Sequence, residues 1–192
     1  MSHTIIHISR EFGSGGRIIG EKLAAELNIP FYDKTIIEMV AKKSGLPPEL
    51  IEQSETLSPT AFGFDLESAV YYTSITDETF FAQSAVIREI ASKGSCVIIG
   101  RCADYVLRDE PGLVKIFVRS PIEERARFAV SEYKMSPDKI ESRLKKIDKD
   151  RANYYKFYTT QAWGDMKNYD LVINSAHTGI DKAVELIKMA VE

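Results

Sequence analysis

A glycine-rich segment near the N-terminus is the part of the chain best suited to binding an anion. Residues 8–17 read Ile-Ser-Arg-Glu-Phe-Gly-Ser-Gly-Gly-Arg, between a short apolar run and the start of a helical pattern. Glycines allow consecutive backbone N–H groups to point into one concavity, and the N-terminus of a helix adds partial positive charge there. The segment therefore predicts a phosphate-binding loop. Its predicted phosphate-binding residues are Gly13, Ser14, Gly15 and Gly16.

A tight turn between a strand and a helix is the alternative interpretation of these glycines. Two arginines, Arg10 and Arg17, flank them and favour an anion site, because a guanidinium donates to two phosphate oxygens at once. The usual phosphate loop reads Gly-x-x-x-x-Gly-Lys-Ser/Thr, with the lysine on the transferred phosphate and the hydroxyl on magnesium. Here the lysine position is Gly16 and the hydroxyl position is Arg17, or, with the alignment shifted by one residue, Arg17 and Ile18. Either an arginine replaces the lysine, or the loop binds a nucleotide without transferring phosphate.

Two further arginines stand where they could reach the same site. Arg101 follows an apolar run at 96–99, and Arg151 lies in a segment of alternating basic and acidic residues followed by tyrosines. In an open parallel sheet the ligand crevice lies outside the carboxyl ends of the strands, which places Arg10 and Arg101 near it. Residues 136–160 are interpreted as a lid that closes on phosphates, with a solvated helix face as the alternative. For each arginine, a surface salt bridge is the competing explanation.

Alternating strand-like and helical patterns predict the elements that position these residues. Short β-branched or apolar runs predict strands at 4–8, 30–33, 96–99, 114–118 and 169–173. Helical spacing predicts helices from 17, over 34–43, 76–93 and 180–191, with others capped by Ser120 and opened by Ser136-Pro137. The pattern is typical of a three-layer α/β domain with a parallel sheet of about five strands and helices on both faces. Residues 45–75 are interpreted as an insert or flap on the acceptor side.

Composition limits the classes of function. The 192 residues fit one domain over 1–192. A net charge of −3 gives no basic excess for nucleic acid, and no apolar run is long enough to span a membrane. The cysteines, Cys96 and Cys102, have no metal-like spacing to other Cys or His residues, so we expect no metal site from side chains of this kind and a reduced, cytoplasmic setting.

Several motifs together resemble one family. Gly100-Arg101 resembles the Gly-Arg-Asp turn of bacterial cytidylate kinases, and residues 120–127, Ser-Pro-Ile-Glu-Glu-Arg-Ala-Arg, resemble a helix start in the same enzymes. Residues 148–151, Asp-Lys-Asp-Arg, resemble the end of their lid motif, and residues 171–175 resemble their last strand. Order and spacing agree along nearly the whole chain apart from 45–75. The sequence is most similar to the cytidylate kinase-like family of the nucleoside monophosphate kinase superfamily.

The resemblance implies a P-loop NTPase fold with a helical lid. It implies transfer of the γ-phosphate of ATP, with Mg²⁺, to a nucleoside monophosphate such as CMP or dCMP, or to a related small acceptor. Arg10, Arg17 and Arg151 would be catalytic, and Asp33 and Arg101 would bind the acceptor. The alternative function is a nucleotide-binding module without kinase turnover, because the loop lysine is replaced. The aromatic residues of the 45–75 insert are compatible with a homodimer contact.

Overall fold

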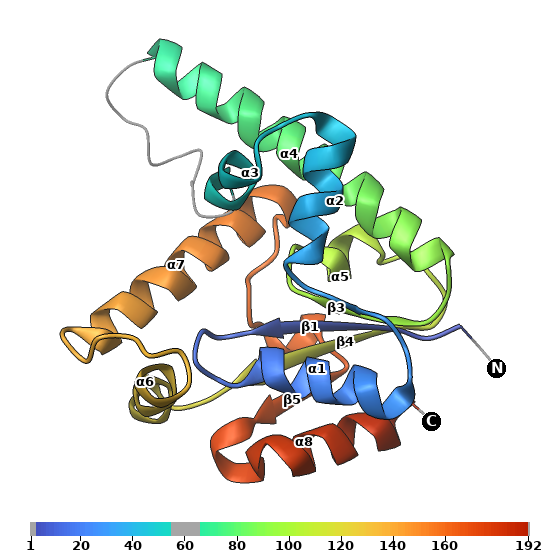
Figure 1. Ribbon diagram of the computed structural model, residues 1–192, viewed down its shortest axis with the longest axis vertical. Coiled ribbons are helices and arrows are strands. Elements are labelled where there is room, and N and C mark those ends of the chain that lie inside the picture. Colours follow the sequence, from blue (N-terminus) through green and yellow to red (C-terminus); the bar gives the residue numbers. More distant parts are fainter. Residues whose placement is uncertain (1–2, 55–65, 192) are drawn as a thin grey trace.

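A computed structural model describes residues 3–54 and 66–191 (Figure 1). These residues contain a five-stranded sheet in which every pairing is parallel, in the order β2-β3-β1-β4-β5. The strands are β1 (Ile5–Arg10), β2 (Phe31–Tyr32), β3 (Cys96–Ile99), β4 (Leu113–Arg119) and β5 (Leu171–Asn174). The predicted parallel sheet of about five strands is therefore confirmed.

Strand β1 lies at the centre of the sheet and pairs with two strands from distant parts of the chain. It pairs with β3 on one side and with β4 on the other, so that Ile5 lies opposite both Cys96 and Leu113. Its Ile6 and Ile8 side chains pack on one face of the sheet, while Ile5 packs on the other. Such two-sided burial explains why the strand is apolar and β-branched along its length.

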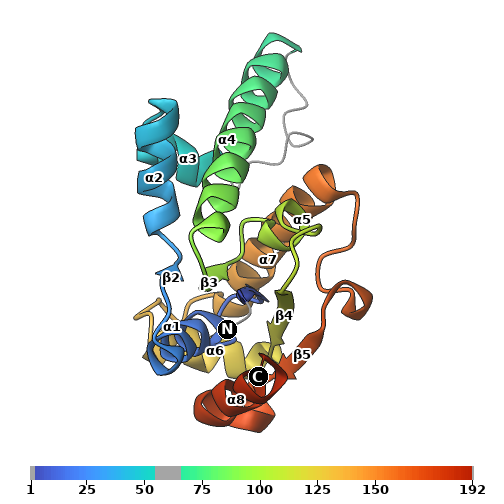
Figure 2. The same ribbon diagram turned by 90° about the vertical axis from the view of Figure 1, so that its right-hand side faces the viewer.

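Helices cover both faces of the sheet (Figures 1 and 2). Helices α1 (Gly16–Leu27) and α8 (Ser175–Val191) pack on the face that holds Ile6 and Ile8. The opposite face is covered by the remaining large helices and closes a second apolar core. These helices are α2 (Thr35–Ser44), α3 (Pro48–Ser54), α4 (Leu66–Ser92), α5 (Ala103–Val106) and α7 (Ile140–Thr159). Helix α6 (Ile122–Ser131) follows β4 and contacts α7, and a 3₁₀ turn, Met166–Asn168, precedes β5.

The region interpreted as an insert is largely helical where the structure describes it. Residues 48–54 form α3, and α4 begins at Leu66, ten residues before the predicted start of that helix at 76. Residues 55–65 of the predicted insert lie outside the described residues. Helix α4 spans 27 residues and contacts α2 and α3, so the insert and the long helix form one helical layer.

Two predicted helix starts are wrong, for local reasons. Ser120 does not cap α6: the helix begins at Ile122, so the cap position falls on Pro121, which has no side-chain oxygen to accept a hydrogen bond. Likewise, α7 begins at Ile140 rather than at the Ser136-Pro137 pair. The Ser136 hydroxyl instead accepts the N–H of Asp138 at 3.3 Å, which closes a turn ahead of the helix.

Candidate active site

A cleft of about 670 Å³ opens at the carboxyl ends of β1 and β3. It brings together eight of the nine residues predicted from the sequence, all except Ser14. These eight are Arg10, Gly13, Gly15, Gly16, Arg17, Asp33, Arg101 and Arg151. Because Ile8 pairs with Ile99, Arg10 and Arg101 each stand two residues beyond the same rung of the sheet. This register explains why the two arginines reach one cleft.

The backbone of the loop between β1 and α1 requires glycine. Gly13 and Gly15 have φ values of 81° and 76°, in the left-handed region that side chains rarely adopt. An added Cβ on Gly13 would lie 2.7 Å from the backbone oxygen of Arg125, and one on Gly16 would lie 2.7 Å from Cβ of Arg10. The lysine of a usual phosphate loop therefore has no room at position 16, because the Arg10 side chain occupies it.

Ser14 points away from the cleft. Its hydroxyl donates to the backbone oxygen of Glu11 at 2.8 Å, and the residue is 2% exposed. Its backbone N–H donates to the same Glu11 oxygen at 3.3 Å, so both polar groups of Ser14 are bonded within the loop.

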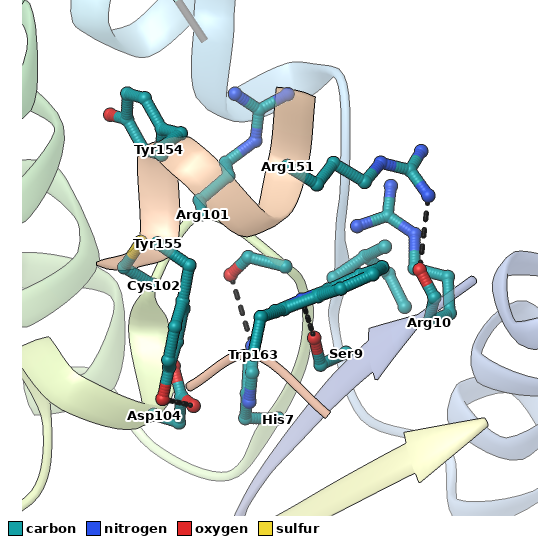
Figure 3. A pocket seen from close by; sticks show the side chains of 12 residues that line it. His7, Ser9, Arg10, Arg101, Cys102, Asp104, Arg151, Tyr154, Tyr155 and Trp163 are labelled. Carbon is teal, nitrogen blue, oxygen red and sulfur yellow. Dashed lines mark hydrogen bonds between the residues drawn. The ribbon is translucent and has the colours of Figure 1, made fainter. Parts of the chain in front are cut away.

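Three arginines from three segments of the chain meet in the cleft: Arg10 at the end of β1, Arg101 after β3 and Arg151 in α7 (Figure 3). We call them the arginine cluster. The Arg151 guanidinium donates to the backbone oxygen of Arg10 at 3.0 Å. Burial and the neighbouring Arg10 lower the pKa of Arg101 to about 10 and that of Arg151 to about 9. Buried like charges are unfavourable until an anion joins them, so this cluster favours a bound phosphate.

Arg17 and Asp33 form one side of the cleft. The Arg17 Nε–H donates to Asp33 Oδ2 at 2.9 Å, and Arg17 also pairs with Glu21 at 3.1 Å. Asp33 Oδ1 lies 3.9 Å from Arg10 Nη2, so this carboxylate faces two arginines at once. The aspartate therefore orients the guanidiniums on either side of the glycine loop.

A buried ion network that the sequence did not reveal holds the glycine loop against α7. The side chain of Arg125, 7% exposed, pairs with Asp148 and lies 3.5 Å from Glu11. Arg125 also donates to the backbone oxygen of Phe12 at 3.1 Å, while Asp148 accepts the Phe12 N–H at 2.9 Å. Arg125 and Asp148 both lie in motifs that resemble those of cytidylate kinases. These motifs indicated that the two residues are important, but not that they pair.

His7, on β1, is buried close to the arginine cluster. It is 1% exposed, and its Nε2 lies 3.1 Å from the backbone oxygen of Gly100. Burial lowers the pKa of His7 from its ordinary value of 6.5. Since the unfolded chain then binds a proton that the folded chain does not, the folded state loses stability as pH falls below about 6.5.

We therefore expect a pH dependence of stability that His7→Gln removes. Below pH 6.5, His7 should cost the wild type up to about 1.4 kcal/mol of unfolding free energy per pH unit, down to the folded-state pKa. Urea unfolding of both proteins at pH 7.5, 6.5 and 5.5 measures this. A constant difference between the two proteins across the three pH values would contradict it.

Two solved kinases share the fold of this chain. Shikimate kinase from Bacteroides thetaiotaomicron superposes with a TM-score of 0.59 at 12% identity, covering 99% of each chain. A gluconokinase from Sinorhizobium meliloti superposes with a TM-score of 0.55 at 16% identity, covering 98% of this chain and 93% of that one.

The sequence places the chain more closely. It matches the family model of the cytidylate kinase-like family over residues 5–177, and it belongs to that family. A protein named cytidylate kinase from Thermococcus kodakarensis is 25% identical over 190 residues, covering 98% of this chain and 88% of that protein. A solved structure of an uncharacterized protein from Eubacterium ventriosum superposes with a TM-score of 0.76 at 28% identity, covering 98% of each chain.

In residues 3–54 and 66–191 no helix combines the length and apolar character needed to cross a membrane. Within the same ranges no three His, Cys, Asp or Glu side chains are grouped as a metal site. A metal that enters with a nucleotide needs no such group, since Mg²⁺ is commonly held by phosphates, waters and one or two carboxylates.

Proposed function

We propose that this protein is an ATP-dependent phosphotransferase that moves the γ-phosphate of ATP to a small phosphate-bearing acceptor, with CMP and dCMP as the first candidates. The observation that carries this proposal is the arginine cluster, which shares one cleft with a glycine loop at the N-terminus of α1. Phosphoryl transfer needs little covalent chemistry from a protein, but it needs charge neutralisation and positioning. Membership of the cytidylate kinase-like family supports the same function.

The cleft offers a site for each phosphate group. Backbone N–H groups of residues 13–16 and the N-terminus of α1 suit the donor phosphates. Arg10 takes the place of the loop lysine, because its side chain runs past Gly16 toward Gly100. Arg101, at the end of β3, suits the acceptor phosphate. Arg151, which bonds the backbone of Arg10, suits charge that develops between donor and acceptor.

The residues present fit Mg²⁺-ATP. The arginine cluster and the loop match a triphosphate, and the carboxylates of Glu11, Asp33 and Asp150 line the same cleft. Bound Mg²⁺ would neutralise phosphate charge, with these carboxylates and the phosphates themselves as its ligands. The Ser14 hydroxyl is not among them, since Ser14 is 2% exposed and does not line the cleft.

We assign the mobile part of the catalytic cycle to residues 136–160. Helix α7 contributes Ile147, Asp150 and Arg151 to the cleft, so its movement would open or close the arginine cluster. Glu52 of α3, in the insert, lines the cleft, which supports an acceptor-side role for the insert. A single domain over 1–192, with this lid and insert, accounts for the site.

ATP consumption with Mg²⁺ against CMP, dCMP and UMP tests the proposal. We expect turnover above about 1 s⁻¹ with one acceptor, in the range usual for kinases. The second candidate function, a nucleotide-binding module without turnover, is favoured by Arg17 at the hydroxyl position, where it is paired with Asp33. Tight ATP binding without turnover on any acceptor would decide for that second function.

A further inference from the structure

A second, smaller cavity lies beneath the arginine cluster. It has a volume of about 100 Å³ and lies between the sheet and the segment formed by α7 and Trp163 (Figure 3). His7, Ser9 and Asp104 are among its polar residues, and the rings of Tyr155 and Trp163 are among its aromatic ones. The arginine cluster lines it as well, so the cavity and the larger cleft share one wall. We call it the His7–Asp104 cavity.

Two residues that line this cavity each carry a buried acceptor atom without a partner. His7 and Asp104 are 1% and 3% exposed, and neither His7 Nδ1 nor Asp104 Oδ1 has a hydrogen-bond partner among the described residues. Because His7 Nε2 lies 3.1 Å from the carbonyl oxygen of Gly100, it carries the ring hydrogen, and Nδ1 presents a lone pair. The other oxygen of Asp104 accepts the Tyr155 hydroxyl at 2.8 Å.

The chemistry of these two atoms defines the group that fits. Both accept hydrogen bonds, so their partner must donate, and a buried acceptor without a donor is strongly unfavourable. A hydroxyl donates once, whereas a primary ammonium donates three times and satisfies both atoms. The rings of Tyr155 and Trp163 also favour a cation, since aromatic faces attract one.

The size of the cavity and its other wall define the rest of the ligand. At about 100 Å³ the cavity is smaller than the roughly 150 Å³ that accepts a benzene ring, so a short aliphatic group fits and a six-membered ring does not. The arginine cluster at its border binds an anion and would place a phosphate a short distance from the amine. The phosphate in turn offsets the positive charge that the ammonium would otherwise meet.

We propose that the His7–Asp104 cavity is a second subsite of the active site, and that it takes the primary amine of a short aliphatic phosphate monoester whose phosphate lies on the arginine cluster. This inference rests on the phosphate site of the proposed function and adds a second recognition element to it. An acceptor without the amine leaves both buried atoms to water.

Binding of a matched pair of small phosphates tests the inference. Trp163 is the single tryptophan of the chain and lines the cavity, so its fluorescence reports occupancy, with calorimetry as the second readout. We expect 2-aminoethyl phosphate to bind the wild-type protein at least about tenfold more tightly than ethyl phosphate, since a charged hydrogen-bonded pair forms in a buried site. This affinity ratio is measured on the wild-type protein alone, so it tests the inference even if a buried substitution prevents folding.

Asp104→Asn assigns the effect to the cavity. The variant should reduce the ratio to less than about twofold while leaving ethyl phosphate binding unchanged, since asparagine keeps the shape and the bond to Tyr155 but loses the charge. The control is Asp109→Asn, whose side chain is 89% exposed on the loop after α5; it should keep the full ratio.

The outcomes separate this inference from the function on which it rests. Equal binding of the two phosphates by the wild type would overturn the inference alone and leave the cavity to water. An undiminished ratio in Asp104→Asn would also overturn it. If neither phosphate nor inorganic phosphate binds, the arginine cluster is not an anion site, and the proposed function fails together with the inference.

Discussion

Replacing Arg10 by alanine is expected to lower kcat by about 10³-fold. An arginine that stabilises transferring phosphate contributes factors of this order. Here the Arg10 side chain lies next to Gly16, at the position that a loop lysine would need, and Arg151 bonds to the backbone oxygen of Arg10 rather than to its guanidinium. The substitution therefore removes the central charge and leaves the backbone contact in place. Steady-state kinetics with the acceptor that proves active measure it.

A matched surface variant controls for the loss of one positive charge. Arg127 lies in α6, its side chain is 72% exposed, and its ion pair is with Glu124 on the same helix. Arg127→Ala should leave kcat within about twofold of the wild type, because exposed pairs contribute little. A kcat of Arg10→Ala that also stays within about twofold would exclude Arg10 from the role of the lysine. Arg10→Lys should recover part of the loss, since lysine restores the charge but not the planar fork.

Replacing Arg125 by alanine should lower the free energy of unfolding by about 3 kcal/mol. Its guanidinium is buried between Asp148 and Glu11 and donates to Phe12, so its removal leaves a carboxylate that is 14% exposed and a backbone oxygen without their donor. Breaking one partner out of a buried ion pair costs this much in general. Urea denaturation, followed by circular dichroism, measures the change.

An exposed ion pair on α7, the helix of Asp148, provides the control. Lys145 and Glu141 pair across one turn of α7, with side chains 65% and 49% exposed. Lys145→Ala should change the unfolding free energy by less than about 0.5 kcal/mol. If Arg125→Ala changes the unfolding free energy as little as Lys145→Ala does, the contacts of Phe12 do not depend on the network. In that case Arg125→Met should have the same unfolding free energy as Arg125→Ala, although methionine fills more of the buried space.

The sequence predicted the sheet and the arginines of the cleft because both follow from local rules. Short apolar β-branched runs form strands, and residues just beyond the carboxyl ends of parallel strands meet. Arg10 and Arg101 are the example, since each stands directly beyond a predicted strand. The glycine loop was predicted for the same reason: its residues are neighbours in the chain.

Contacts between distant side chains were beyond the reach of sequence patterns. Arg125 and Asp148 lie 23 residues apart on two helices, and no periodicity links them. Ser120 has the residue type and spacing of a helix cap, but the cap position of α6 falls on Pro121, and the Ser120 N–H instead donates to Glu11, 109 residues earlier. Asp104 gave no signal, because the cavity that it lines exists only after α5, α7 and the sheet have packed.

The position of β1 at the centre of the sheet has a consequence for synthesis on the ribosome. The first strand to emerge pairs only with β3 and β4, so Ile5 has no strand partner until Cys96 and Leu113 have been synthesised. At about 5–20 residues per second, the interval to Cys96 alone is about 5–20 s. Throughout this interval an apolar β-branched segment is without its partners. Nascent chains stalled before β3 should therefore recruit chaperones that bind extended apolar peptides, and chains stalled beyond β4 should release them.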